Sequence, residues 1–582
     1  MFDVIIKGGT VVDGTGAPRR VADVAVRDGR IVEVADRIVG EAKEVIDATG
    51  RIVTPGFVDV HTHYDGQVSW DSLLEPSSCH GVTTVVVGNC GVGFAPVRPG
   101  REQWLVQLME GVEDIPGTAL HEGINWTWET FPEYLDAIAA REYAVDIAAY
   151  VPHGAVRGYV MGDRGARNEE ATPDDIAEMA CIVAEARRAG AVGFSTSRTM
   201  GHRARDGEPV PGTFADEAEL NAIADALVQA GGGIFEVAPE VLPTGGEQPT
   251  MSMAEELEWM GEIALRTDLK VSYLLLQYGT VPDQWRESLA YSREILAKGG
   301  YLRPQVAARA FGMMIGWQGY HPFNKRPTYA RLASEFAGDA LFAELAKAEN
   351  RAAILAEADD EVDPNVQFDG IGGFLQMALD QLYVIGPECD YEPTRERSVT
   401  ALAAADDGVE PLAKCYDLLN EDGGRAFLMM PLLNYVDASE DVIHEMITDP
   451  VAISGLSDGG AHVRMICDAS MPTYLLTHWA RDRHRGPKLD LEEAVRLQTS
   501  ATAEFLGFDD RGVIEVGRKA DLNVIDFDNL KLNYPHAVDD LPAGGRRLLQ
   551  GAEGYVATVV NGVVTRRNGV DTGERPGRLV RA

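Results

Sequence analysis

GFVDVHTHYD, residues Gly56–Asp65, is the most informative stretch of this chain. It opens as an apolar strand and closes with two histidines and two acids within seven residues. Side chains two positions apart on a strand point to the same face, so His61 and His63 present both imidazoles together. Such a pair at the end of a strand predicts a site for one divalent metal ion. The alternative is a histidine pair with a purely structural role.

The composition is that of a globular soluble protein, with 45% hydrophobic and 25% charged residues. A length of 582 residues exceeds one small domain and suits a large barrel plus a second unit. Lys and Arg number 52 against 91 Asp and Glu, which gives a net charge of −39. Such a polyanion is repelled by nucleic acid and by anionic membranes, so we expect neither as a partner.

The cysteines and the apolar runs indicate the compartment. Six cysteines are scattered without a CxxC pair, which favours a reducing environment over a disulfide framework. No apolar run approaches the ~20 residues of a membrane helix, and the start of the chain has no signal-peptide pattern. We therefore expect a cytoplasmic protein that acts on a small molecule, and homo-oligomerisation is left open.

Short apolar runs alternate with helical stretches from about residue 55 to about residue 510. The runs include TTVVVGNCG, VDIAAYVPHG, AVGFSTS, GGIFEVAP, KVSYLLLQYG and VAISGLSDGG. This pattern predicts an α/β fold, a (β/α)8 TIM barrel over residues 56–510. The stretch from about 325 to 445 is mostly helical and too long for a simple loop, so we expect a helical insertion over one face.

The two ends of the chain share a β-rich style with Gly turns. FDVIIKGGTVVDGTG and ADVAVRDGRIVEVA lie near the start, and GVIEVGRKADLNVIDFD and YVATVVNGVVTRR lie near the end. Asn561-Gly562 between two β-branched runs is a strong hairpin signal. We expect residues 1–55 and 511–582 to form one small β-sandwich domain together.

Six motifs are spread along almost the whole chain. They are TPGFVDVHTHYD, GVTTVVVGNCG, VPHGAVRGYVMG, GAVGFSTS, GLSDGG and GRKADLNVID. Together they resemble the amidohydrolase superfamily, and within it the D-aminoacylase (N-acyl-D-amino-acid deacylase) branch. The first and last motifs are common to the superfamily, whereas GNCG is more specific to this branch. The predicted insertion is the part of the chain that the resemblance covers least well.

The resemblance implies a metal ion that activates water and polarises the scissile carbonyl. It assigns the role of general base, and then of acid toward the leaving nitrogen, to Asp458 in SGLSDGG. It also implies that Cys90 in GNCG ligates zinc. From the residues alone, Asp458 could be a turn residue before glycines. Cys90 could equally be a small buried hydrophobe.

This sequence departs from the branch at the other metal ligands. The branch takes two further histidines from the fifth and sixth barrel strands, but the matching GGGIFEVAPE and KVSYLLLQYG contain no histidine. No lysine lies between Lys43 and Lys270, so a carbamylated lysine cannot come from the second to fifth strands. Glu236 or Gln277 could substitute in part, since a carboxylate oxygen is an acceptable zinc ligand.

We therefore expect one divalent ion per chain, zinc by its ligands, held by His61, His63 and Asp458. Cys90 or Glu236 would lie nearby, and water would complete the shell. Three protein ligands and an open position are what a catalytic zinc site requires.

Other polar residues follow the predicted strands. The candidates for substrate contact are Ser197, Arg198, His202, His153 and His462. Arg198 with Arg203 could grip a carboxylate, or both could lie in a solvated loop. His153 belongs to a family motif, and hydrogen bonding within the barrel top is its alternative role. His462 follows Asp458 by four residues and could add a ligand or carry a proton.

The sequence thus predicts a metal-dependent hydrolase of a non-peptide C–N bond, most simply in an N-acyl amino acid. Three alternatives stay open. The bond could belong to a cyclic amide, as in hydantoinases, or to an ester or lactone. The chain could also be a binding or scaffold protein that has lost catalysis on the same fold.

Overall fold

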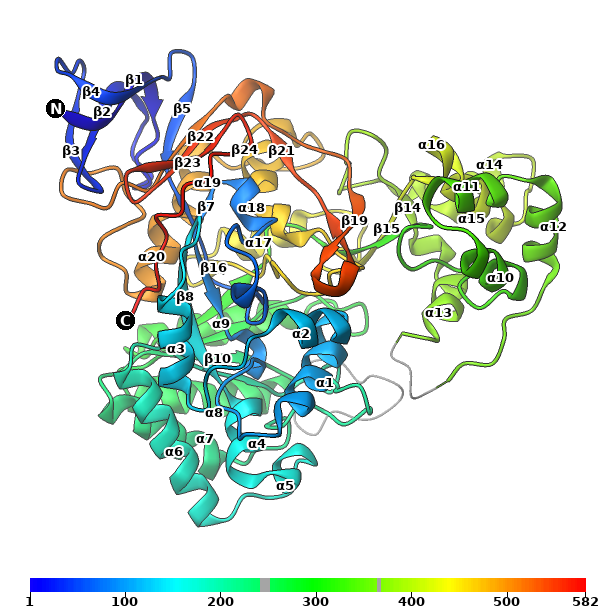
Figure 1. The fold of residues 1–582 in the computed structure, drawn as a ribbon, viewed down its shortest axis with the longest axis horizontal. Coiled ribbons are helices and arrows are strands. Elements are labelled where there is room, and N and C mark those ends of the chain that lie inside the picture. Colours follow the sequence, from blue (N-terminus) through cyan, green and yellow to red (C-terminus); the bar gives the residue numbers. More distant parts are fainter. Residues whose placement is uncertain (241–251, 364–367) are drawn as a thin grey trace.

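The computed structural model describes residues 1–240, 252–363 and 368–582, and element labels follow Figure 1. Eight parallel strands in these residues form one sheet whose spatial order follows the sequence. They are β6 (Phe57–Asp59), β7 (Val82–Val87), β8 (Asp146–Pro152), β9 (Gly193–Ser197), β10 (Ile234–Ala238), β11 (Lys270–Leu274), β12 (Leu302–Val306) and β16 (Ile453–Ser454). The predicted α/β barrel is confirmed.

The sheet curls until its two edge strands meet just beyond their carboxyl ends. Thr62, after β6, forms a parallel bridge with Gly459, after β16. The backbone N–H of His63 donates to the carbonyl of Gly459 at 2.8 Å. The first and last barrel strands therefore deliver His61, His63 and Asp458 to one place.

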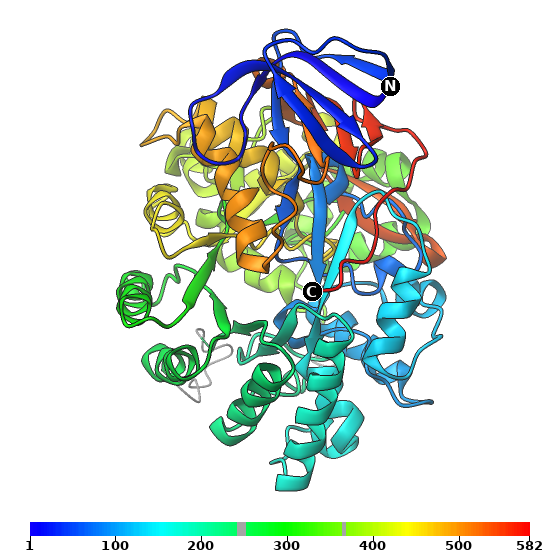
Figure 2. The ribbon, with the colours of Figure 1, turned by 90° about the vertical axis from the view of Figure 1, so that its left-hand side faces the viewer.

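Helices lie on the outside of the strands, as Figure 2 shows for the cyan and green part of the chain. They are α1 (Glu102–Glu113), α2 (Gly117–Gly123), α3 (Phe131–Ala139), α4 (His153–Met161), α5 (Asp163–Ala166), α6 (Pro173–Arg188), α7 (Glu217–Gln229), α8 (Met253–Arg266), α9 (Gln284–Ala297), α17 (Asp441–Ile447), α18 (Met471–Tyr474), α19 (Leu491–Leu497) and α20 (Ser500–Leu506). Side-chain caps define the first residues of two of these helices. Asp216 accepts from the N–H of Glu219 at the start of α7, and Ser252 and Glu255 form a capping box at the start of α8.

Both chain ends build a second, nine-stranded sheet, drawn in blue and red in Figure 1. Its strands are β1 (Phe2–Val11), β2 (Arg20–Arg27), β3 (Arg30–Ala35), β4 (Ala42–Asp47), β5 (Ile52–Pro55), β17 (Leu522–Ile525), β22 (Tyr555–Val560), β23 (Val563–Arg567) and β24 (Val570–Asp571). The antiparallel pairing of β5 with β17 joins the two ends. Asn561 and Gly562 have φ of 50° and 79°, as the predicted hairpin turn requires.

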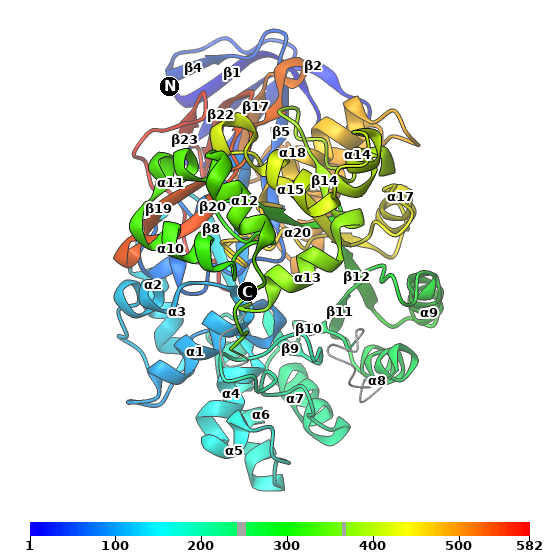
Figure 3. The same cartoon turned by 90° about the vertical axis from the view of Figure 1, so that its right-hand side faces the viewer.

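A helical segment projects from the barrel between β12 and β16, in green and yellow in Figures 1 and 3. It contains α10 (Pro327–Glu335), α11 (Gly338–Leu345), α12 (Ala348–Ala356), α13 (Ile371–Met377), α14 (Val399–Ala405), α15 (Pro411–Leu419) and α16 (Glu421–Gly424). A small sheet of β13 (Phe311–Ile315), β15 (Leu428–Leu433) and β14 (Tyr383–Val384) connects it to the barrel. The segment has an apolar core of its own, around Trp317, Phe323 and Tyr416. No helix in the described part of the chain is long and apolar enough to cross a membrane.

Candidate metal and active site

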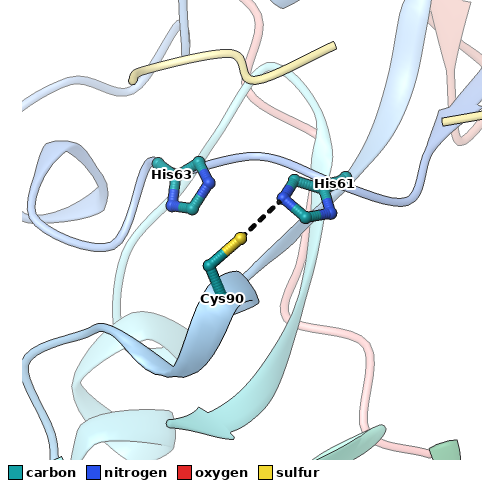
Figure 4. A group of neighbouring side chains, drawn as sticks. All are labelled: His61, His63 and Cys90. Carbon is teal, nitrogen blue, oxygen red and sulfur yellow. Dashed lines mark hydrogen bonds between the residues drawn. The ribbon is translucent and has the colours of Figure 1, made fainter. Parts of the chain in front are cut away.

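His61, His63 and Cys90 form a buried group at the carboxyl end of the barrel (Figure 4). Their ligand-type atoms all lie within 4.8 Å of one another, and His61 Nε2 is 3.3 Å from Cys90 Sγ. The two histidines follow β6 and the cysteine follows β7, so adjacent strands supply the group. Two imidazoles and a thiol at this spacing match the donor set of a zinc site.

The turn that carries Cys90 requires glycine. Gly88 has φ of 82°, and a Cβ added there would lie 2.4 Å from the carbonyl oxygen of Tyr150. Cys90 itself has φ of 53°, a left-handed conformation that is rare for a residue with a side chain. The Asn89 amide donates to the carbonyl of Thr62 at 3.0 Å and so ties the turn to the histidine loop. Strained backbone of this kind is characteristic of functional sites.

Asp458 lies beside the same group. Its Oδ1 is 3.5 Å from Nε2 of His61 and 3.9 Å from Nε2 of His63. The residue has φ of 49° in the loop after β16. Burial raises its pKa well above the ordinary carboxyl value, and the nearby Asp468 and Asp59 raise it further. The acid predicted from SGLSDGG therefore faces both histidines.

Two polar residues that the sequence did not single out lie beside the Nδ1 atoms of the two histidines. Gln305 Oε1, on β12, is 2.9 Å from Nδ1 of His61. Glu113 Oε1, at the end of α1, is 3.2 Å from Nδ1 of His63. Partners on Nδ1 leave Nε2 of each ring directed toward Asp458, which is how metal-binding histidines are commonly oriented.

The protonation of the histidines suits metal binding. Burial lowers the pKa of His61 to about 4, although the hydrogen bond with Gln305 acts in the opposite direction. Burial and the neighbouring His61 also lower the pKa of His63 well below its usual value. Both imidazoles are therefore neutral at pH 7, and neutral imidazole is the form that ligates a metal.

Glu236 and Asp65 are buried close to this group. Glu236 Oε2 accepts from the backbone N–H of Cys90 at 3.1 Å, and its Oε1 lies 4.0 Å from Nδ1 of His61. Burial raises the pKa of Glu236 to about 8 and that of Asp65 to about 8. Gln277 is held elsewhere, because its amide donates to the carbonyl of Pro282.

A cavity of about 280 Å³ opens beside His61, His63 and Cys90, which we call the metal-type residues. Its polar lining among the described residues is His61, His63, Cys90, Glu113, His202, Asp458 and His462. His202 Nδ1 is 3.0 Å from Oγ of Ser197, so Ser197 lies behind the histidine. Two of the predicted substrate-contacting residues, His202 and His462, therefore face the same cavity as the metal-type group.

The other two predicted substrate residues lie in buried ion pairs. His153 Nε2 is 2.7 Å from Glu219 Oε1, and Arg157 donates to the same oxygen at 2.6 Å. Arg198 donates to Glu256 at 3.2 Å and to a backbone carbonyl. Among the residues that the structure describes, the cavity lining includes neither His153 nor Arg198.

A TIM barrel with two histidines, a cysteine and an aspartate at its carboxyl end defines a hydrolase of the metal-dependent type. The chain belongs to the amidohydrolase family, whose profile matches residues 44–566. It is therefore a hydrolase that acts on carbon–nitrogen bonds other than peptide bonds.

Similar proteins come from several bacteria. An uncharacterized protein of Mycobacterium tuberculosis is 28% identical over 98% of this chain and 92% of its own length. A D-aminoacylase of Alcaligenes xylosoxydans xylosoxydans is 38% identical over 34% of this chain and 37% of its own length. A crystal structure of D-aminoacylase superposes with a TM-score of 0.65, at 25% identity and with all of both chains covered. The resemblance expected from the sequence motifs is confirmed.

Proposed function

We propose that this protein hydrolyses an N-acyl amide with one zinc ion per chain, held by His61, His63 and Cys90, and with Asp458 as general base and acid. The observation that carries the proposal is the convergence of these four side chains at the end of the barrel, beside a cavity. Imidazole and thiolate are ligands that suit zinc. When bound, the ion supplies a water of lowered pKa and polarises the amide carbonyl.

The residues of the chain have separate roles in this proposal. Asp458 accepts the proton of the attacking water and later donates it to the leaving nitrogen. Gln305 accepts from Nδ1 of His61 and so fixes the tautomer of that ring, and Glu113 lies 3.2 Å from Nδ1 of His63. Glu236 holds the backbone of Cys90 in place through the N–H that it accepts.

His202 and His462 are the proposed contacts to substrate, since both line the cavity. Ser197 acts through His202, to which it is hydrogen-bonded. His153 and Arg198 are proposed to shape the barrel top rather than to touch substrate, because their side chains are bound to Glu219 and Glu256.

Metal analysis combined with an amidase assay tests the proposal. Purified protein is expected to carry about one zinc ion per chain, because His61, His63 and Cys90 form one ligand set at the end of the barrel. Amine release from N-acyl amino acids and neutral N-acyl amines is measured as purified, after chelation, and after zinc is returned. Activity should disappear with the metal and return with it. Full turnover by metal-free protein would contradict the proposal, and two fully occupied ions would contradict the single site.

A further inference from the structure

Most of the residues in the wall of the cavity are apolar. Barrel loops and the inserted segment both contribute to it, through Leu274, Leu276, Phe311, Met313, Leu433 and Met465. Leu274 and Leu276 lie at the end of β11, so an apolar surface occupies a strand end that could have carried polar groups. A substrate that fills this cavity must therefore place apolar surface against this wall.

The ionisable lining of the cavity includes acids but neither lysine nor arginine among the described residues. Its acids are Glu113 and Asp458, and the other ionisable lining residues are Cys90 and four histidines. The two segments outside the description, VLPTGGEQPTM at 241–251 and PNVQ at 364–367, contain no lysine or arginine in their sequence. They cannot supply a cation to the cavity either.

Arg203, Arg464 and Arg198 lie close to lining residues in sequence: Arg203 donates to the backbone carbonyl of Gly207, and the other two donate to carboxylates. Arg464 precedes the lining residue Met465, and it donates to Asp114 at 3.1 Å while packing over the ring of Tyr320. Arg198 is bound to Glu256. Both guanidinium groups are therefore engaged with carboxylates of the protein and not directed toward a substrate.

We propose that the natural substrate is an uncharged amide with a bulky apolar substituent, and not an N-acyl amino acid with a free carboxylate. The inference rests on the proposed amide hydrolysis and names its substrate class. A carboxylate in this cavity would lose its hydration without gaining a lysine or arginine partner among the described lining residues, and the proposed zinc ion is engaged by water and the amide carbonyl. An apolar group at the same position is stabilised, because its surface is transferred from water to the apolar lining of the cavity.

A set of matched substrates tests the proposal. N-octanoyl-3-methylbutylamine and N-octanoyl-leucine, as the D and the L compound, differ only by the carboxylate. Zinc-loaded protein should hydrolyse the neutral amide with a kcat/KM at least about tenfold higher than either acid. N-octanoyl-D-leucine amide, which replaces the carboxylate with an uncharged group, should be hydrolysed faster than the D acid.

A variant at an exposed lining residue tests whether the lack of a cationic side chain is the reason for this preference. Leu432 lines the cavity and is 44% exposed, so a long polar side chain can replace it without burial. Leu432→Arg should raise the ratio of acid to neutral kcat/KM about two- to fivefold. The matched control Leu432→Gln, which adds no charge, should leave that ratio close to the wild-type value.

The outcomes separate the substrate class from the proposed function. Preference of the wild type for an acid, abolished by Arg464→Gln, would overturn the inference and leave metal-dependent amide hydrolysis standing. Equal effects of Leu432→Arg and Leu432→Gln would also overturn it, because the missing cation would not be the reason. Failure of the zinc-loaded protein to hydrolyse any of these amides would refute the proposed function and this inference with it.

Discussion

Replacement of Gln305 by leucine tests the orientation of His61 without changing any of the proposed metal ligands. Gln305 is fully buried, and its Oε1 lies 2.9 Å from Nδ1 of His61. Leucine is similar in size, so the change removes the acceptor and leaves the cavity filled. The Nδ1–H of His61 then has no acceptor in a buried environment, and the ring loses the contact that favours Nε2 as the free nitrogen.

The expected magnitude follows from that single contact. A buried donor left without a partner costs about 1–3 kcal/mol. Part of this cost can be avoided if the ring shifts its proton to Nε2, but that tautomer cannot ligate a metal through Nε2. Either outcome weakens metal binding, and loss of such an outer partner typically reduces affinity ~10–100-fold.

Zinc affinity is measured by competition with a chromophoric chelator, and unfolding by denaturant is measured in parallel. Gln305→Glu retains an acceptor and should bind zinc nearly as well as the wild type. Ser272→Ala removes only the hydroxyl that Gln305 Nε2 contacts at 3.3 Å, so it controls for packing around the amide. Zinc affinity of Gln305→Leu within twofold of the wild-type value would refute the orienting role.

The other predictions concern the ligands, the base and one buried ion pair. His61→Ala should lower zinc content and turnover together, whereas Asp458→Asn should lower kcat ~10²–10⁴-fold with only partial metal loss; near-normal turnover would remove Asp458 from the mechanism. Cys90 should react slowly with a thiol reagent in zinc-loaded protein and faster after chelation, and a rate that ignores the chelator would exclude it as a ligand. Burial alone would raise the pKa of Glu219, but His153 and a nearby arginine lower it to about 2 from 4.5. Its ionised form therefore contributes about 3 kcal/mol to stability above pH 4.5, and this contribution is lost as the pH falls toward 2. Denaturant unfolding of wild type and Glu219→Gln should differ most near neutral pH, and a constant difference down to pH 3 would contradict this sign.

Most of the barrel could be predicted because its strands are continuous apolar runs. β7 reads VTTVVV and is buried along its whole length, as expected for a parallel strand covered on both faces. The strand β12 was missed because it is not a continuous apolar run. Its sequence, LRPQV, contains an arginine, a proline and a glutamine, which do not form an apolar pattern. Gln305 lies on this strand, so the partner of His61 was missed together with the strand.

The metal-type residues were found because they are close in sequence to strand ends, and Glu113 was missed because it is not. Glu113 is the last residue of helix α1, whose buried face is otherwise apolar, and its residue type alone does not distinguish it from a surface acid. Only the docking of this helix beside His63 turns the carboxylate inward. A buried acid on an apolar helix face is the signal that would have identified it.

The pairing of β5 with β17 has a consequence for synthesis of the chain. The first strands emerge from the ribosome hundreds of residues before the strand that lies beside β5. The edge of β5 therefore stays open while the barrel is being made, and it is a site where two nascent chains can pair with each other. A protein truncated after the barrel would keep this exposed edge permanently. We expect such a product to aggregate even though every residue of the proposed metal site is present.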